Sequence, residues 1–440
     1  MDDFNIYRLV SSGFPLFGVN KLRELSRLVF EISKKEKIAP HTILSSLYGL
    51  PYEKIKRALL KRRYPETFGK APLNSFYLPK YEADATLQAV REDGLFFPEN
   101  VFYVKEARNS PLLARVKEIF PGARFVLADS LKDFIKDKKF SISGYNRRTK
   151  NLFITEEKYD YFKKCPCTSD VVNCGYSVMN TGMGCPYECS YCFLQGYQNI
   201  AAIVLPYNIS DYLNENKMMT KAKGFFNIKR IGSGEFTDSL VFDDITRFSV
   251  PIIDFFKKHK DIYFEFKTKS VNIKNLLLCG GSPNIVAAWS VNSKEMSRGN
   301  EHKTPQMEAR LEAAKQCALA GFGTAFHFDP VIIYDNWRQG YKETVDMIFD
   351  IVPADSVKWI SLGTLRMPAA LKPVIENRFP DNTILDGELL LGKDYKLRYD
   401  KEKRIEIYGF LSGLIRKKKS GAAVYLCMEE ADVWRKSGIL

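Results

Sequence analysis

The alternation of strand and helix patterns from about residue 175 onward constrains the fold of this chain most. Short apolar runs rich in β-branched and aromatic residues alternate with helical stretches such as 305–320 and 338–351. Repeated β–α units give a parallel sheet with crossover helices, hence an α/β fold that is an open or closed barrel. We therefore expect active residues at the carboxyl ends of the strands. The expected strands are YSVMNTG, FNIKRIGSG, YFEFKTKS, NIVAAWSVNS, GTAFHFDPVI and VKWISLGTLR.

The segment before this region predicts two smaller parts. Residues 18–66 show apolar residues at helical spacing and resemble a helix-turn-helix, whose second helix lies in the major groove of DNA. A plain three-helix bundle with a basic face shows the same pattern. Residues 100–129 predict a strand, a helix and a strand. The basic residues of the second helix are Lys54, Lys56, Arg57, Lys61, Arg62 and Arg63.

We expect three divisions of the chain. Residues 1–70 form the basic helical module, and 71–174 form a small α/β extension with a linker. Residues 175–440 form the barrel, which ends in a C-terminal helix and a short strand, AVYLC.

Composition indicates a polyanionic partner and a reducing compartment. The net charge is +14, from 66 Lys and Arg against 52 Asp and Glu, which favours nucleic acid, although a solvated basic surface gives the same sum. No apolar run approaches the ~20 residues of a membrane helix, and no signal-peptide pattern is found. The nine cysteines show no disulfide-scaffold pattern. We expect a cytoplasmic protein with no membrane partner.

Three cysteines lie close together in GMGCPYECSYCFLQ, directly after the first expected barrel strand. Cys185, Cys189 and Cys192 are separated by three and two residues, and the next cysteine is Cys279. A structural zinc site or a simple ferredoxin cluster completes its ligand set with a fourth cysteine or a histidine. Three thiolates instead hold three irons of a [4Fe–4S] cluster and leave the fourth iron open for a small ligand.

This loop resembles that of the radical S-adenosylmethionine superfamily, whose motif has the same spacing and an aromatic residue, here Tyr191, before the last cysteine. The resemblance implies that the open iron chelates the amino and carboxylate groups of S-adenosylmethionine. It also implies an external one-electron reductant, such as flavodoxin or ferredoxin, and a 5′-deoxyadenosyl radical. Ser233, Gly234 and Glu235 look like the superfamily's Gly-Gly-Glu element, in which a bare backbone allows close approach and a carboxylate accepts hydrogen bonds from the ammonium.

Over about residues 100–440 the chain is similar to the spore photoproduct lyase family. That resemblance implies a partial (β/α)6-type barrel and hydrogen abstraction from a thymine dimer in DNA. Thr237, Lys269 and Ser293 fall where the family contacts S-adenosylmethionine, although a solvated charge and strand-end hydroxyls are the plainer interpretations. The matching stretches are GCPYECSYCFLQ, FTDSL, FEFKTKSVNIKNLL, WSVNS, ARLEAAKQCALAGF, WRQGYKE and VIENRFP.

The chain differs from the family at the hydrogen relay, the cysteine and assisting tyrosine that return hydrogen to the product radical in the lyases. The position of the lyase cysteine holds Glu235, and that of the assisting tyrosine holds Phe193. A carboxylate O–H is a poor hydrogen-atom donor and a phenyl ring has no labile hydrogen. Cys427, at the end of AVYLC, is a candidate catalytic thiol, while a buried inert cysteine is the plainer interpretation.

A second cysteine group lies upstream, in KKCPCTSDVVNCGY. Cys165, Cys167 and Cys174 are candidates for a second iron–sulfur cluster, or for zinc with one outside ligand, or are thiols packed under the barrel. Their spacing is irregular and no fourth ligand is evident in the sequence.

The sequence thus favours a radical S-adenosylmethionine enzyme that acts on nucleic acid, with DNA favoured. One alternative is a radical enzyme that modifies a peptide or a small molecule. Another is a non-catalytic iron–sulfur DNA-binding sensor, which the residues expected around a cosubstrate oppose. No flavin-binding signature supports a light-driven photolyase.

Overall fold

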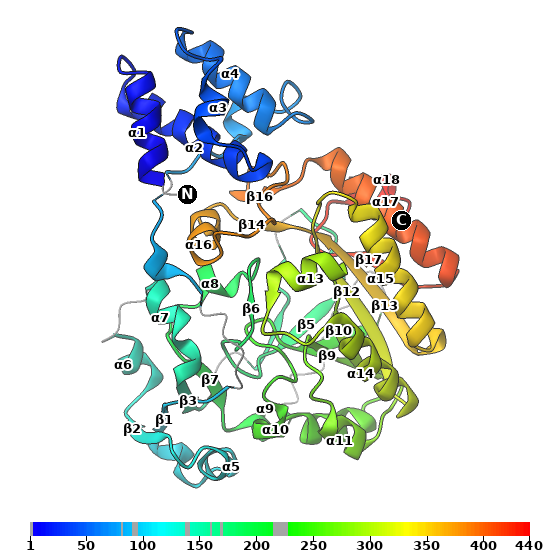
Figure 1. Cartoon of the computed structure of the whole chain (residues 1–440). Coiled ribbons are helices and arrows are strands. Elements are labelled where there is room, and N and C mark those ends of the chain that lie inside the picture. The colour runs from blue at the N-terminus through cyan, green and yellow to red at the C-terminus, as the bar shows by residue number, and fades with distance from the viewer. Residues whose placement is uncertain are drawn as a thin grey trace. The chain divides into compact units, whose positions relative to one another are not determined.

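The computed structural model of the chain describes residues 3–80, 82–89, 96–136, 141–158, 161–167, 170–213 and 228–440 (Figure 1). The chain divides into two compact units. The first unit comprises Met1–Ala89, Ile332–Asp335 and Leu365–Arg404, and the second comprises Val90–Val331, Asn336–Thr364 and Ile405–Leu440. No helix among the described residues is long and apolar enough to cross a membrane.

The second unit is built on an eight-stranded sheet in the order β17-β13-β12-β10-β9-β8-β5-β4. All neighbours pair in parallel except β4, which runs antiparallel to β5. Each of the six expected strands is present, and β17 adds a seventh parallel strand. The strands are β4 (Phe162–Lys164), β5 (Tyr176–Met179), β8 (Lys229–Ser233), β9 (Ile262–Thr268), β10 (Ile285–Ser290), β12 (Gly323–Val331), β13 (Val357–Thr364) and β17 (Val424–Leu426).

This sheet curls into a half-barrel. The Arg230 guanidinium on β8 donates to the Tyr425 hydroxyl on β17 at 3.1 Å, although four strands separate β8 from β17 in the sheet. In a flat sheet five strand spacings would hold these strands about 24 Å apart. The expected partial α/β barrel is therefore confirmed.

Helices connect the parallel strands, as the β–α pattern predicts, and α14 packs against β10 and β12. Buried apolar runs such as IVAAWS in β10 are typical of strands that are covered on both faces of the sheet. The helices of this region are α8 (Leu194–Tyr197), α9 (Ile209–Leu213), α10 (Asp243–Thr246), α11 (Ser249–Lys258), α12 (Lys274–Cys279), α13 (Lys294–Asn300), α14 (Met307–Leu319), α15 (Trp337–Ile351), α17 (Lys401–Lys418) and α18 (Ala431–Lys436).

A second parallel sheet, with four strands in the order β2-β1-β3-β7, lies in the same unit. Its strands β1, β2 and β3 precede the half-barrel in the sequence. The expected strand, helix and strand over residues 100–129 are confirmed. The fourth strand of this sheet, β7, follows the cysteine loop in the chain and therefore fixes the end of that loop. The elements are β1 (Asn100–Val104), α5 (Pro111–Ile119), β2 (Arg124–Ala128), α6 (Leu131–Lys136), α7 (Ile142–Asn146), β3 (Asn151–Thr155) and β7 (Ile203–Pro206).

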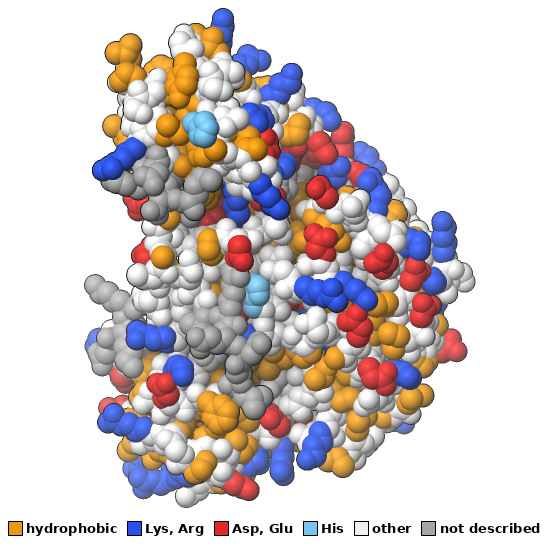
Figure 2. All heavy atoms as spheres, in the orientation of Figure 1, with side chains coloured by type: hydrophobic (Ala, Val, Ile, Leu, Met, Phe, Trp, Pro, Cys, Tyr) orange, Lys and Arg blue, Asp and Glu red, His pale blue; other side chains and the backbone are white. Residues whose placement is uncertain are grey.

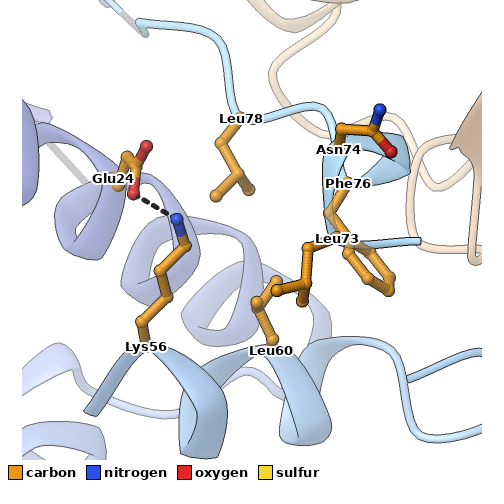
Figure 3. A pocket seen from close by; sticks show the side chains of 7 residues that line it. All are labelled: Glu24, Lys56, Leu60, Leu73, Asn74, Phe76 and Leu78. Atoms are coloured by element: carbon orange, nitrogen blue, oxygen red, sulfur yellow. Dashed lines mark hydrogen bonds and ion pairs between the residues drawn. The ribbon is translucent and has the colours of Figure 1, made fainter. Parts of the chain in front are cut away.

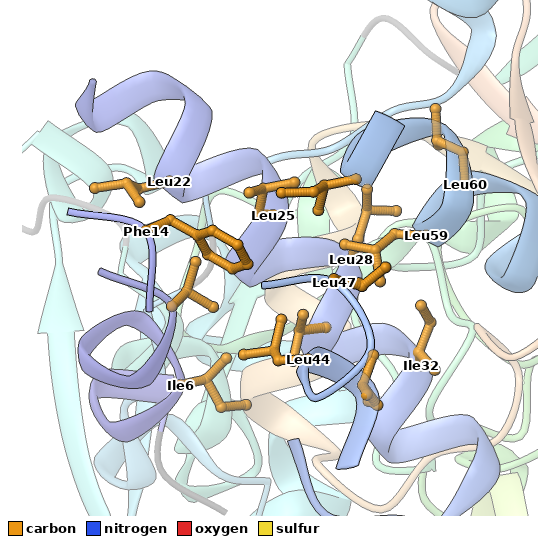
Figure 4. Packing of buried hydrophobic residues seen from close by; sticks show 14 of the residues in the cluster. Ile6, Phe14, Leu22, Leu25, Leu28, Ile32, Leu44, Leu47, Leu59 and Leu60 are labelled. Atoms are coloured by element: carbon orange, nitrogen blue, oxygen red, sulfur yellow. The ribbon is translucent and has the colours of Figure 1, made fainter. Parts of the chain in front are cut away.

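The first unit packs its N-terminal helices around an apolar core (Figure 4). One long helix contributes Leu25, Leu28 and Ile32 to this core, and the two helices that follow it contribute Leu44 and Leu59. All five side chains are fully buried. This is the packing that the helical spacing of apolar residues predicts. The elements of the unit are α1 (Asp3–Gly13), α2 (Val19–Glu36), α3 (Pro40–Leu44), α4 (Tyr52–Arg63), α16 (Leu371–Arg378) and the sheet β14 (Arg366–Pro368), β16 (Lys396–Arg398) and β15 (Leu390–Leu391).

A buried ion network explains why residues 365–404 belong to this unit. Glu31 on α2 accepts from Arg27 at 2.7 Å, from Arg63 at 2.8 Å and from Lys372 on α16 at 2.7 Å. Arg27 also donates to Glu376 at 2.9 Å. The sequence-based division placed residues 365–404 with the barrel, because the sequence does not show which distant charges they meet.

Replacing Glu31 with glutamine is expected to destabilise the first unit by about 3–5 kcal/mol, the cost of leaving buried cations without their anion. Burial raises the pKa of Glu31, but the charges of Lys372, Arg27 and Arg63 outweigh it and hold that pKa well below its ordinary value. Urea unfolding measures the loss. Glu24→Gln on the same helix is the control: its ion pair with Lys56 is part-exposed, so the loss should stay below about 1 kcal/mol. Equal losses would contradict the prediction.

Candidate active site

The cysteine loop leaves β5 through two glycines that the backbone requires. Gly184 has a φ of +94°, a conformation that residues with side chains rarely adopt, and its N–H donates to the Phe236 carbonyl at 2.7 Å. A Cβ on Gly182 would come within 2.8 Å of the Val204 carbonyl oxygen. Between them, Met183 exchanges two backbone hydrogen bonds with Val204. The GMG segment therefore anchors the loop to β7.

Arg148 holds the first half of the loop. Its guanidinium is fully buried and donates to the Cys185 carbonyl at 2.9 Å, to the Tyr187 carbonyl at 2.8 Å and to the Glu188 carboxylate at 2.7 Å. Burial lowers the pKa of Arg148, but Tyr145, Glu188 and Cys185 outweigh it and raise that pKa above its ordinary value. Arg148 lies within the predicted extension and linker of residues 71–174, and its role in the loop was not expected from the sequence.

Residues 300–302 hold the second half of the loop. Strand β6 (Glu188–Cys189) pairs antiparallel with β11 (Glu301–His302), which sets Cys189 opposite Glu301. Ser190 donates from its N–H to the Asn300 carbonyl at 2.8 Å and from its hydroxyl to the Asn300 side chain at 2.9 Å. The loop is therefore fixed on both sides by residues distant in sequence.

The three loop cysteines lie within electrostatic range of one another. Burial raises the pKa of the Cys185 thiol, and Asp238, Cys192 and Cys189 add to that rise. Burial likewise raises the pKa of Cys189 to about 12, which the Lys269 ammonium opposes. A bound metal ion would reverse this penalty, because it stabilises the thiolates.

Across the described residues, no three Cys, His, Asp or Glu side chains converge closely enough to bind one metal ion. A single zinc ion needs ligands that converge in this way. A [4Fe–4S] cluster requires a different arrangement of cysteines, because each cysteine binds a different iron of the cluster.

A half-buried cation lies within electrostatic range of the second cysteine. The Lys269 ammonium, after β9, is 5.6 Å from the centre of the Tyr191 ring. Burial lowers the pKa of Lys269, but the charges of Cys189 and Glu301 outweigh it and raise that pKa. Tyr191 donates to Glu301, which also pairs with Arg310 at 2.7 Å. The structure thus brings Tyr191, Lys269 and Cys189 together. Glu301 and Arg310 complete the group and were missed from the sequence.

The end of β8 carries polar atoms that the protein leaves unsatisfied. Among the described residues, the buried side-chain oxygens Ser233 Oγ and Thr237 Oγ1 make no hydrogen bond, and Glu235 Oε2 makes none but lies 3.2 Å from the Lys163 ammonium. Gly234 between them has a φ of +115°, and a Cβ there would lie 3.0 Å from the Thr237 carbonyl oxygen. Buried polar atoms without partners are costly, so they indicate a site that a polar ligand completes. These residues fit the amino acid end of S-adenosylmethionine.

Asp238 orders the segment that follows. Its carboxylate accepts from the Thr268 hydroxyl at 2.6 Å and from the Lys269 N–H at 2.7 Å, which joins the ends of β8 and β9. Asp238 lies in the FTDSL stretch that matches the family, but its role was not expected from the sequence. Ser293 is buried and caps α13, where its hydroxyl accepts from the Met296 N–H at 3.3 Å. That contact is structural and leaves the hydroxyl proton for a ligand.

The residues at the relay positions have their own partners. Glu235 forms an ion pair with Lys163 at 3.2 Å. The Phe193 side chain is 43% exposed and its ring lies 6.2 Å from that of Tyr197, which stacks on Phe236 at 5.3 Å. Cys427 follows β17 and lies near Cys165. The structure therefore groups Cys427 with the upstream cysteines.

The basic helix α4 offers fewer cations to a partner than its sequence suggests. Arg63 is buried with Glu31, Arg62 pairs with Glu36 at 2.6 Å, and Lys56 pairs with Glu24 at 2.7 Å. Figure 3 shows this last pair beside a pocket of about 360 Å³ lined by Leu60, Leu73, Asn74, Phe76 and Leu78.

Three basic residues of α4, Lys54, Arg57 and Lys61, are exposed on one face, at positions i, i+3 and i+7. On the face drawn in Figure 2, Lys and Arg are interspersed with Asp and Glu. Any contact of α4 with a polyanion therefore depends on these three residues.

Comparisons with known proteins agree with this architecture. The family model described as spore photoproduct lyase matches residues 164–413. Curated spore photoproduct lyases from Clostridium acetobutylicum and Bacillus subtilis are 26% and 25% identical to the chain, over 52% and 50% of its length. These matches span 69% and 61% of the two relatives.

A solved spore photoproduct lyase variant with bound AdoMet and dinucleoside spore photoproduct has the same fold. Its TM-score is 0.63 at 20% identity, and the match covers 76% of this chain and 100% of that one. A spore photoproduct lyase complexed with dinucleoside spore photoproduct gives a TM-score of 0.64 at 21% identity, with the same two coverages.

A curled parallel half-barrel with three cysteines in the loop after its first parallel strand defines a radical S-adenosylmethionine enzyme. Since the family model matches more than half of the chain, the chain belongs to the spore photoproduct lyase family.

Proposed function

We propose that this enzyme binds a [4Fe–4S] cluster through Cys185, Cys189 and Cys192 and abstracts hydrogen from a nucleic acid, with DNA favoured. The observation that carries the proposal is the pair of unsatisfied buried hydroxyls of Ser233 and Thr237, with the Glu235 carboxylate between them in the sequence, in the same unit as the three-thiol loop. A sensor without catalysis needs no such polar cradle.

Each residue of the site has a role in this proposal. Glu235 would accept hydrogen bonds from the ammonium of S-adenosylmethionine, while Ser233, Thr237 and Ser293 offer hydroxyls and Gly234 leaves room for the ligand. Lys269 places a positive charge beside Cys189, suited to the cosubstrate's carboxylate or to the anionic cluster. When bound, the cluster and S-adenosylmethionine supply a 5′-deoxyadenosyl radical, with an electron from a reductant such as flavodoxin or ferredoxin.

Two facts support DNA as the substrate. Family relatives were solved with dinucleoside spore photoproduct, a DNA lesion, and this chain carries a net charge of +14. A radical modification of a peptide or small molecule is the second candidate, which the loss of both relay residues favours because the lyase reaction depends on returning a hydrogen atom.

The test is formation of 5′-deoxyadenosine by reconstituted enzyme under reductant, compared among ultraviolet-damaged DNA, undamaged DNA, RNA and no nucleic acid. We expect damaged DNA to give the largest increase. A rate that none of the nucleic acids changes would favour a peptide or a small molecule as the substrate. If no 5′-deoxyadenosine forms under any condition, the proposed radical chemistry is refuted.

Restoring the lyase cysteine is expected to impair the enzyme. In Glu235→Cys a short thiol replaces the carboxylate proposed to accept charge-assisted hydrogen bonds, a loss of about 1.5–3 kcal/mol, or roughly 10- to 150-fold in cosubstrate affinity. Equilibrium binding of S-adenosylmethionine measures it, with Glu235→Gln as the control that keeps the shape and one acceptor. Cosubstrate binding and turnover that improve in Glu235→Cys would show that Glu235 is not a cosubstrate ligand.

DNA binding should depend on the exposed face of α4. Replacing Lys54, Arg57 and Lys61 with glutamine is expected to flatten the dependence of log K on log salt by about 2–3, since each phosphate contact contributes about 0.9. Fluorescence anisotropy with a labelled duplex measures the slope. The control variant replaces the exposed Lys117, Lys132 and Lys136, which removes the same charge elsewhere. An identical slope in both variants would place the contact outside α4.

A further inference from the structure

Four of the nine cysteines meet at one place outside the active-site loop. The thiols of Cys165 and Cys167 are joined by a hydrogen bond, and Cys427 and Cys174 lie within electrostatic range of Cys165. Cys165 and Cys167 follow β4, Cys174 precedes β5, and Cys427 follows β17. Because β4 and β17 are the two edges of the curled sheet, this four-cysteine group lies where the sheet edges approach each other.

Backbone hydrogen bonds fix each cysteine segment. Cys165 donates to the Tyr176 carbonyl at 3.0 Å and Cys167 to the Cys165 carbonyl at 2.8 Å, while Cys427 donates to the Leu362 carbonyl at 2.8 Å. The Val172 N–H donates to the Glu429 carbonyl at 3.0 Å, which ties the segment of Cys174 to that of Cys427. The four cysteines are therefore held together by the fold itself.

The four thiols are partly open to solvent, and their surroundings disfavour negatively charged sulfur as long as no metal is bound. Cys165, Cys167, Cys174 and Cys427 are all half-buried, so a metal could enter. The hydrogen bond with Cys167 and burial raise the pKa of the Cys165 thiol, which Cys427 and Cys174 raise further. Burial also raises the pKa of Cys174, whereas the buried guanidinium of Arg230 opposes that rise.

We propose that Cys165, Cys167, Cys174 and Cys427 form a second, four-thiolate site that binds an iron–sulfur cluster. Four cysteines are the complete ligand set of a [4Fe–4S] cluster. The fourth ligand, which the spacing of the first three cysteines does not reveal, comes from the far end of the sheet. Among the described residues no three thiols converge closely enough to bind one metal ion, whereas each cysteine of a [4Fe–4S] cluster binds a different iron.

The site has a structural consequence. A metal bound by all four cysteines would join the two edges of the half-barrel, since the ligands come from β4, β5 and β17. It would also remove the Cys427 thiol from hydrogen transfer, because a metal-bound thiolate has no S–H hydrogen to give. The second site and a catalytic Cys427 are therefore exclusive alternatives.

The test uses the full chain in which Cys185, Cys189 and Cys192 are alanine, so that any remaining metal lies elsewhere. Metal and sulfide analysis of the anaerobically purified protein should find about four irons and four acid-labile sulfides per chain. Adding Cys427→Ser or Cys174→Ser should reduce the metal to background. Adding Cys317→Ser, a buried cysteine of α14, should leave the metal unchanged.

A second measurement keeps the test valid if a variant fails to fold. In protein that still carries the four cysteines, iodoacetamide should label them slowly until a chelator removes the metal, and rapidly afterwards. The proposal is overturned if the triple-alanine background holds no metal, if metal persists without Cys427, or if labelling is unaffected by the chelator. None of these readouts depends on S-adenosylmethionine, so they stand apart from the proposed function.

Discussion

Replacing Cys185, Cys189 and Cys192 together with alanine is expected to abolish the reductive cleavage of S-adenosylmethionine. Without three thiolates the loop cannot hold a [4Fe–4S] cluster, and cleavage needs both the electron and the open iron. The measurements are iron and sulfide content after anaerobic reconstitution, and 5′-deoxyadenosine formed under dithionite. Wild type should hold about four irons in this loop, and the variant should form no 5′-deoxyadenosine above the protein-free rate.

The control for this variant is Cys279→Ala, at the end of α12, which should retain both the cluster and the cleavage. Metal that remains in the triple variant would belong to the four-cysteine group and would not restore activity, because its ligand set leaves no open iron. Cleavage of S-adenosylmethionine by the triple variant would refute the assignment of the loop.

The parts of the site that the sequence predicts are those carried by local pattern. The motif of Cys185, Cys189 and Cys192 spans only eight residues. Each expected barrel strand is an apolar run bounded by polar or turn residues. Gly234 is likewise recognised from its neighbours Ser233 and Glu235. Such features depend on residues adjacent in the chain, so one sequence is sufficient to find them.

What the sequence does not reveal depends on contacts between distant residues. Arg63 reads as a DNA-facing cation of α4, yet it is buried against Glu31. Glu301 and Arg310 lie more than 100 residues after the loop whose Cys189 they adjoin. Cys427 reads as a lone thiol at a strand end, and only the curl of the sheet brings it to Cys165. Tertiary pairing of charges and thiols is not encoded in spacing.

The expected result of Arg148→Met is loss of most of the cluster from an otherwise folded protein. The substitution leaves the carboxylate of Glu188 buried without its cation and the carbonyls of Cys185 and Tyr187 without their donor. Breaking a buried ion pair costs about 3–5 kcal/mol, and here that cost falls on the loop that binds the cluster. Iron content after reconstitution and the electron paramagnetic resonance signal of the reduced cluster measure the effect.

Two further variants separate the role of Arg148 from a general loss of charge or stability. Arg147→Met removes an exposed neighbouring cation and should keep the full iron content. The double variant Arg148→Met with Glu188→Gln removes both charges, so it should recover part of the cluster while the two carbonyls still lack their donor. Recovery above the single variant but below wild type would divide the loss between the buried charge and the backbone contacts. If Arg148→Met binds as much iron as Arg147→Met, the contacts of the loop with β7, β11 and Asn300 are sufficient to hold it, and Arg148 does not position the cluster cysteines.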